Sequence, residues 1–123
     1  MPGLETILII DDENSVRQAA EEIIKGIGYK VITASGGKEG LDVYKAKKDE
    51  INAVMLDMVM PEMGGEKTFQ ALKQIDPEVK VLLASGYTAI DKAARILDQG
   101  VAGYIQKPFG VKALSRKLRE VLD

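Results

Sequence analysis

Five polar side chains in this sequence each come at or just after the end of a short apolar run. They are Asp11, Asp12, Asp57, Ser85 and Lys107. Asp57 follows the three apolar residues 54–56, and Pro61 comes soon after, which is typical of a buried strand that stops at the carboxylate. A carboxylate in such a place is costly unless another group offsets its charge. We therefore expect the rest of the chain to be arranged around Asp57.

The chemical types of these side chains suit phosphoryl transfer. Two carboxylates about 4 Å apart repel by roughly 4 kcal/mol at an effective dielectric near 20, so three of them need a counter-charge. Lys107 supplies one positive charge, and Mg²⁺ is the usual cation where carboxylate and phosphate oxygens are the ligands. An Asp carboxylate is a competent nucleophile toward phosphorus. Lys107, the Ser85 hydroxyl and a metal ion can stabilise charge on the transferred oxygens.

The composition excludes several other kinds of site. The chain has 123 residues, enough for one domain with a real core, and is 46% hydrophobic and 29% charged. Its net charge of -2 argues against nucleic-acid binding, which needs a basic surface. It has no cysteine and no histidine, which excludes disulfides, thiolate chemistry, a Ser-His-Asp triad and histidine metal ligands. No apolar run approaches the roughly 20 residues that a membrane span needs.

Alternating strand and helix patterns must position these side chains. Apolar, β-branched runs predict strands over residues 6–10, 30–34, 52–57, 79–84 and 102–106. Helical spacing of apolar residues predicts helices over 14–27, 38–47, 66–75, 88–99 and 111–121. This is an α/β pattern of five βα units, which implies parallel pairing through right-handed crossovers and a doubly wound sheet of flavodoxin-like type with helices on both faces. Because the carboxyl ends of such strands share one rim, the five polar side chains should converge there.

In order and position these residues resemble the motifs of a known family. The matching motifs are Asp11-Asp12, Asp57, Ser85 and Lys107-Pro108, and they look like those of the response-regulator receiver domain of bacterial two-component signalling, in the CheY-like superfamily. The resemblance covers Thr6 to Leu122. It implies the strand order 2-1-3-4-5 and a single receiver domain over residues 1–123. It also implies a phospho-accepting regulatory domain, not an enzyme, which catalyses only its own phosphorylation and dephosphorylation.

The resemblance assigns a role to each matching residue. It implies that Asp57 accepts the phosphoryl group, and that Ser85 and Lys107 hold that group. It also implies a bound Mg²⁺ as cofactor. The implied ligands are Asp12 and Asp57 directly, Asp11 mainly through water, and the backbone carbonyl of Val59.

A conformational switch is part of the same resemblance. Tyr104, three residues before Lys107, stands where the family keeps its switch aromatic, and Lys107-Pro108 matches the family's cis peptide. The expected switch residues are Ser85, Tyr104, Lys107 and Pro108. Phosphorylation would draw Ser85 inward, Tyr104 would rotate into the vacated space, and the surface of the fourth helix, fifth strand and fifth helix would be remodelled. A homodimer through that surface is one expected assembly.

The expected partner is a sensor histidine kinase or a phosphotransfer protein that carries the phosphohistidine. That agrees with the absence of histidine from this chain. The segments 83–87 and 103–109 also resemble receivers attached to hybrid sensor histidine kinases. The resemblance implies a cytoplasmic location. Because no output domain follows Asp123, we expect either a stand-alone regulator or a piece of a longer protein.

Each of these residues is also compatible with a purely structural role. Asp11-Asp12 alone is more often a helix N-cap, Ser85 before a glycine can be turn chemistry, Lys107 can be a surface lysine, and Tyr104 can be edge packing. A degenerate receiver that acts as a phosphorylation-independent interaction module is the alternative function. A phosphatase of the haloacid-dehalogenase type would need a second Asp where this chain has Val59. An apolar Val59 also predicts slow loss of the phosphoryl group, because it offers no hydrogen bond to a water.

Overall fold

The fold is built on one five-stranded parallel sheet. A computed structural model of the protein describes residues 5–60, 63–85, 99–107 and 109–123. The strands lie in the order β2-β1-β3-β4-β5, as predicted, and every neighbouring pair is parallel. Their bounds are β1 Thr6–Ile10, β2 Lys30–Ala34, β3 Ala53–Asp57, β4 Val81–Ser85 and β5 Gly103–Gln106.

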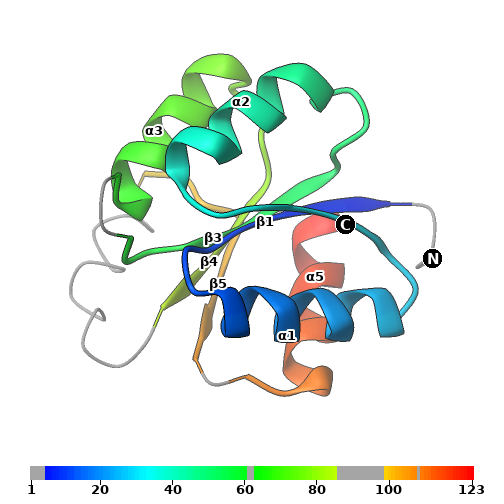
Figure 1. The fold of residues 1–123 in the computed structure, drawn as a ribbon. Helices are drawn as coiled ribbons and strands as arrows, with labels where there is room; N and C mark the ends of the chain where they lie inside the picture. The colour runs from blue at the N-terminus through cyan, green and yellow to red at the C-terminus, as the bar shows by residue number, and fades with distance from the viewer. Residues whose placement is uncertain (1–4, 61–62, 86–98, 108) are drawn as a thin grey trace.

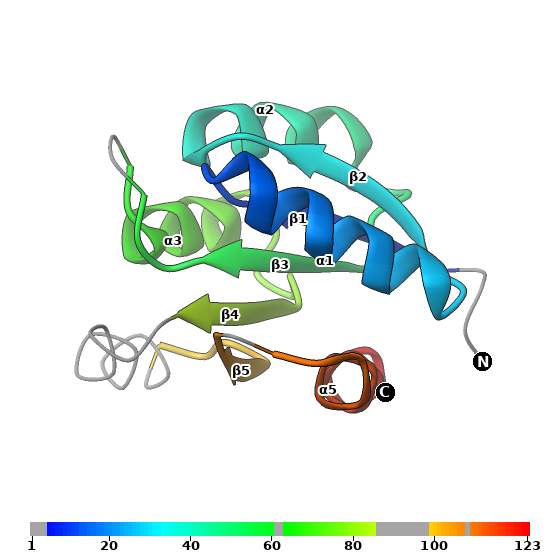
Figure 2. The same ribbon diagram turned by 60° about the horizontal axis from the view of Figure 1, so that its bottom comes forward.

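Helices cover both faces of the sheet. Their bounds are α1 Asn14–Gly26, α2 Gly37–Lys47, α3 Gly65–Ile75 and α5 Val111–Leu122. In Figures 1 and 2, α1 and α5 lie on one face and α2 and α3 on the other. The helix predicted over 88–99 lies outside the described residues, except for Gln99. The α/β prediction with helices on both faces is confirmed.

Burial on both faces explains why the central strands are apolar except at their ends, where Thr6, Asp57 and Ser85 lie. All residues of β1, β3 and β4 are buried, so successive side chains enter opposite cores. Leu8, Leu56 and Leu83 pack with Phe69 and Leu72 of α3 in one core. The other core holds residues from β1, β3 and β4 together with Ile24 of α1 and three side chains of α5. These three, Leu114, Leu118 and Val121, recur at helical spacing.

Some boundaries differ from the sequence prediction for identifiable reasons. β4 begins at Val81 rather than Val79, because residues 76–79 form a turn in which the Val79 backbone N–H donates to the Asp76 carbonyl at 3.0 Å. Val79 is buried, so its apolar side chain resembles a strand residue although its backbone is in a turn. α2 and α3 begin on glycines, Gly37 and Gly65, which were predicted as turn and loop residues.

Gly65 brings the start of α3 against the chain that leaves β3. A Cβ atom at this position would lie 2.6 Å from the backbone Cα of Met58, and 3.0 Å from the carbonyl oxygen of Asp57. The Gly65 backbone N–H donates to the Met58 carbonyl at 2.8 Å. At the neighbouring Gly64, the nearest atom to such a Cβ is 3.9 Å away, an ordinary contact. Gly65 is therefore required for close backbone approach and Gly64 is not.

A polar cluster ties the end of α5 to the start of β1, at the end of the strands away from the rim. The Arg119 guanidinium donates to the Glu5 carboxylate, with both contacts at 3.1 Å, and to the Tyr29 hydroxyl at 3.2 Å. It also contacts Asp123 at 2.6 Å. Lys80, which precedes β4, donates to the Leu122 carbonyl at 2.8 Å. These contacts hold both ends of the described chain together.

Candidate functional site

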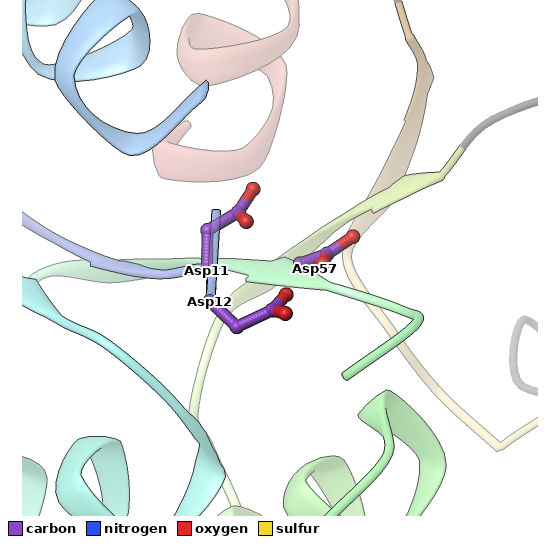
Figure 3. A group of neighbouring side chains, drawn as sticks. All are labelled: Asp11, Asp12 and Asp57. Atoms are coloured by element: carbon purple, nitrogen blue, oxygen red, sulfur yellow. The ribbon is translucent and has the colours of Figure 1, made fainter. Parts of the chain in front are cut away.

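Three carboxylates gather at the carboxyl ends of β1 and β3. Asp11 follows the last residue of β1, Asp12 comes next, and Asp57 is the last residue of β3. Since β1 and β3 are paired and parallel, their ends lie side by side. Each carboxylate offers one oxygen, and these oxygens all lie within 4.8 Å of one another (Figure 3). The convergence predicted from the sequence is therefore present.

Lys107 bridges two of these carboxylates. Its Nζ atom lies 2.9 Å from Asp57 Oδ1 and 3.1 Å from Asp11 Oδ2. Burial acts to lower the pKa of Lys107, but the contacts with Asp57 and Asp11 outweigh it, so the pKa lies above its ordinary value. The ammonium is therefore held in its charged form between two acids. Lys107 follows β5, and the bridge joins it to residues that lie 50 and 96 positions earlier in the sequence.

Asp57 is a buried carboxylate that is poorly compensated. Its exposed fraction is only 5%. Burial raises the pKa of Asp57 to about 6, and the charge of Asp11 adds to that effect. The hydrogen bond from Lys107 and a backbone hydrogen bond from Val59 act in the opposite direction. Burial dominates because the single ammonium is shared with Asp11.

Ser85 and Tyr104 form a hydrogen-bonded pair beside this cluster. Ser85 is the last residue of β4 and is buried, and its Oγ lies 2.8 Å from the Tyr104 hydroxyl of β5. The Lys107 backbone N–H donates to the Ser85 carbonyl at 2.8 Å, which extends the ladder between the two strands. The Tyr104 ring packs partly buried against the core on the α2 and α3 face. The two predicted switch residues are thus in direct contact.

Val59 and Pro108 are the remaining residues that were predicted to belong to the site. The Val59 side chain is 60% exposed, beside the acidic cluster in the chain that leaves β3. Its backbone N–H is hydrogen-bonded to Asp57, and the metal-binding role predicted for its carbonyl stays a prediction. Pro108 lies outside the described residues. A hollow of 510 Å³ adjoins Asp12 and is lined by residues of α2 and of the loop before it, and by Met60 and Met63. The acidic cluster therefore opens toward solvent on that side.

The donor set fits a small divalent cation. Ligands on opposite sides of an Mg²⁺ ion are about 4.2 Å apart, twice the usual bond length. The carboxylate oxygens lie within 4.8 Å of one another, so a small inward movement, or one ligand acting through water, would satisfy the ion. The set contains oxygen donors only, which is the preference of Mg²⁺.

Two supporting contacts around Asp11 were not anticipated from the sequence. Asp11 Oδ1 accepts from the Glu13 backbone N–H at 2.9 Å, and the Asp11 carbonyl accepts from Arg17 Nη1 at 2.8 Å. The first is a local turn of the kind that Asp favours, and the Asp-x-Glu spacing could have indicated it. The second joins the start of α1 to the end of β1. Neither contact uses the Asp11 oxygen that faces Lys107, which is Oδ2.

Comparisons with known proteins agree on one family. Residues 7–119 match the family described as response regulator receiver domain. The sensor kinase CckA of Brucella abortus (strain 2308) is 31% identical over 123 residues, which is 100% of this chain and 13% of that protein. The probable transcriptional regulator ycf27 of Porphyridium aerugineum is 36% identical over 118 residues, 96% of this chain and 48% of that protein.

A solved structure gives the same result for the fold. A response regulator receiver domain protein from Clostridium thermocellum superposes with a TM-score of 0.93 at 30% identity, covering 97% of this chain and 94% of that chain. The chain spans less than half the length of the two curated relatives named above. No helix among the described residues is long and apolar enough to cross a membrane.

Proposed function

We propose that this chain, which belongs to the response regulator receiver domain family, is a signalling switch whose Asp57 accepts a phosphoryl group. The observation that carries this proposal is the buried Asp57 carboxylate, bonded to Lys107 and grouped with Asp11 and Asp12 at one rim. A phosphoryl-transfer site needs this combination of nucleophile, ammonium and metal-binding acids. Residues 1–123 are proposed to form a single receiver domain.

The donor in this proposal is a phosphohistidine of a sensor histidine kinase or phosphotransfer protein. An Asp57 carboxylate oxygen forms a bond to phosphorus, the phosphorus–nitrogen bond breaks, and the imidazole leaves with its electron pair and takes up a proton. Lys107 exchanges its contact with Asp57 for one with a phosphoryl oxygen. Mg²⁺ held by Asp12 and Asp57, by Asp11 mainly through water and by the Val59 carbonyl, would neutralise charge on the phosphoryl oxygens.

The proposed consequence of phosphorylation is a population shift. The new charge of about -1.5 to -2 attracts the Ser85 hydroxyl. Ser85 then leaves the Tyr104 hydroxyl, which it contacts at 2.8 Å in this structure. Movement of Tyr104 would remodel the face that carries β5 and α5, and the helix predicted beside them over 88–99 lies outside the described residues except for Gln99. A homodimer through that face, a hybrid-kinase origin and a cytoplasmic place of action are further parts of the proposal that rest on the family.

The direct test is phosphorylation by a small donor. Incubation with acetyl phosphate and Mg²⁺ is expected to add one phosphoryl group per chain, seen as a single shifted band on a phosphate-affinity gel. Chelation of Mg²⁺ with EDTA should reduce that band at least tenfold, because the acidic cluster then lacks its cation. Steady release of phosphate over many turnovers would indicate a phosphatase. An unmodified chain would favour the alternative, a phosphorylation-independent interaction module.

Val59→Asn is expected to shorten the lifetime of the phosphoryl group severalfold. The side chain at this position is 60% exposed beside Asp57, so an amide there can hydrogen-bond a water that attacks phosphorus. The decay of the phosphorylated band after removal of acetyl phosphate measures the rate. Val111→Asn, at another exposed valine far from Asp57 in the sequence, is the matched control and should decay like the parent. Equal decay of the Val59→Asn variant and the parent would contradict the idea.

Ser85→Ala is expected to separate phosphorylation from switching. The variant keeps Asp57 and Lys107, so part of the phosphorylation should remain. It loses the hydroxyl that contacts Tyr104 at 2.8 Å, so the chemical-shift change at Tyr104 on adding beryllofluoride and Mg²⁺ should fall by more than half. Equal changes at Tyr104 in the variant and the parent would argue against a switching role for Ser85.

A further inference from the structure

One buried hydrogen-bond donor near the site lacks a partner. Among the described residues, the only buried side-chain nitrogen or oxygen without a hydrogen-bond partner is Nε2 of Gln106. Gln106 is the last residue of β5 and directly precedes Lys107. A buried amide donor without an acceptor is unfavourable, and such groups are rare in native proteins. A conformation that supplied an acceptor would therefore be favoured at this residue.

The register of the sheet places Gln106 on the same face as the switch pair. Gln106 is the direct partner of Ser85 between β4 and β5. Gln106 and Tyr104 are two residues apart on β5, so their side chains point to the same face and their Cα atoms are about 6.6 Å apart. The contact between Ser85 Oγ and the Tyr104 hydroxyl shows that Ser85 shares this face. Three polar side chains thus lie together on one face at the ends of two strands.

In this structure the Tyr104 hydroxyl is hydrogen-bonded to Ser85, and Nε2 of Gln106 has no hydrogen-bond partner. The proposed function moves the Ser85 hydroxyl toward the phosphoryl group, which removes the partner of Tyr104. We propose that Gln106 is a positioning residue that receives the Tyr104 hydroxyl when Ser85 releases it, through a hydrogen bond from Gln106 Nε2 to the Tyr104 oxygen. This inference rests on the proposed function.

Gln106 would therefore shift the equilibrium between the state in which Ser85 contacts Tyr104 and the state in which Ser85 has moved away. The unpaired donor destabilises the state in which Ser85 holds Tyr104, and the new bond stabilises the state in which Ser85 has left. A residue can shift a conformational equilibrium only through such a difference between states. Removal of the amide should therefore leave Asp57 reactive while weakening the response of Tyr104.

The test uses the whole chain labelled with 3-fluorotyrosine and ¹⁹F NMR. The Tyr104 signal is assigned by its loss in Tyr104→Phe. Each protein is measured with and without saturating beryllofluoride and Mg²⁺, and the signal of bound beryllofluoride reports occupancy of the site. Gln106→Leu and Gln106→Met both remove the amide while keeping a side chain of similar size, so either one serves if the other folds poorly. Gln74→Leu, at an exposed glutamine of α3, is the matched control.

The expected result is full binding of beryllofluoride by every variant. The shift of the Tyr104 signal should match the parent in Gln74→Leu and fall to less than half in the two Gln106 variants. The same two variants should also need more urea to unfold when unliganded, because no unpaired donor remains. An undiminished Tyr104 shift in the Gln106 variants would overturn the role of Gln106 and leave the proposed function intact. Failure of the parent to bind beryllofluoride would instead overturn the proposed function, and this inference with it.

Discussion

The Asp57→Asn variant is expected to accept no phosphoryl group from acetyl phosphate and yet to be more stable than the parent. Loss of acceptance follows because a neutral amide is not a nucleophile toward phosphorus. The gain in stability follows because burial raises the pKa of Asp57 to about 6 from its ordinary 3.8. The folded state then binds a proton more tightly than the unfolded state. Stability contributed by this group is therefore present below about pH 4 and lost as the pH rises through about 6.

The expected size of the stabilisation follows from the same shift. One pKa unit corresponds to about 1.4 kcal/mol. A shift of about two units, discounted for screening at the open rim, predicts a gain of about 1 to 2 kcal/mol for Asp57→Asn at pH 7.5. Urea unfolding in EDTA, with no divalent cation present, measures the difference, and the gain should vanish near pH 4. Asp49→Asn, at an exposed position after α2, is the control and should change neither property.

Persistence of acid-labile phosphate in Asp57→Asn would place the acceptor elsewhere in the chain. A loss of stability at pH 7.5 would contradict the account of an uncompensated carboxylate. It would mean instead that the contact with Lys107, at 2.9 Å, outweighs the cost of burying the charge. The two measurements are independent, because phosphorylation reports the reactivity of the carboxylate and urea unfolding reports its effect on the free energy of unfolding.

Gly65→Ala is expected to lower the free energy of unfolding by about 2 to 3 kcal/mol. The added Cβ would lie 2.6 Å from the Cα of Met58, and neither backbone can move without breaking the 2.8 Å bond between the Gly65 N–H and the Met58 carbonyl. The distortion would fall on the chain that follows Asp57. We therefore expect phosphorylation by acetyl phosphate to slow at least tenfold as well.

Gly64→Ala provides a matched control one residue away. Its Cβ would meet nothing closer than the Met58 carbonyl at 3.9 Å, and Gly64 has a φ of -67°, which alanine adopts readily. Its unfolding free energy should stay within about 0.5 kcal/mol of the parent. Urea unfolding of both variants measures the contrast. Similar losses in the two variants would show that the clash at Gly65 does not determine stability.

The convergence of the site could be predicted because it depends on topology alone. A run of apolar residues on both faces identifies a central parallel strand, and the polar residue that ends it must lie at the common rim. This explains how Asp57 and Asp11 lie together although they are 46 positions apart in the sequence, and the strand order and the family are confirmed. The roles of all the site residues in the reaction, from phosphoryl acceptance by Asp57 to switching by Ser85 and Tyr104, stay predictions.

Details that depend on packing between distant residues could not be predicted. Gly37 and Gly65 look like turn residues in the sequence, but they begin helices where a side chain would strike a neighbouring segment. Val79 has a strand-like side chain and lies in a turn. Lys107 was expected to balance charge in general, and its specific bridge to both Asp11 and Asp57 needs three-dimensional placement. Gln106 is an ordinary polar residue in the sequence and becomes notable only through its burial.

The Arg119 cluster has a consequence for how this unit could sit within a larger assembly. Arg119 joins Glu5 to α5, so both ends of the described chain lie at the end of the sheet opposite the rim that holds Asp57. The two ends of the sheet are separated by about one strand length, roughly 17 Å. A larger protein could contain this domain as an insertion, with both connecting segments on the same side. The proposed kinase would then approach Asp57 at one end of the sheet, and the connections to the larger protein would leave from the other end, so the two would not compete for space.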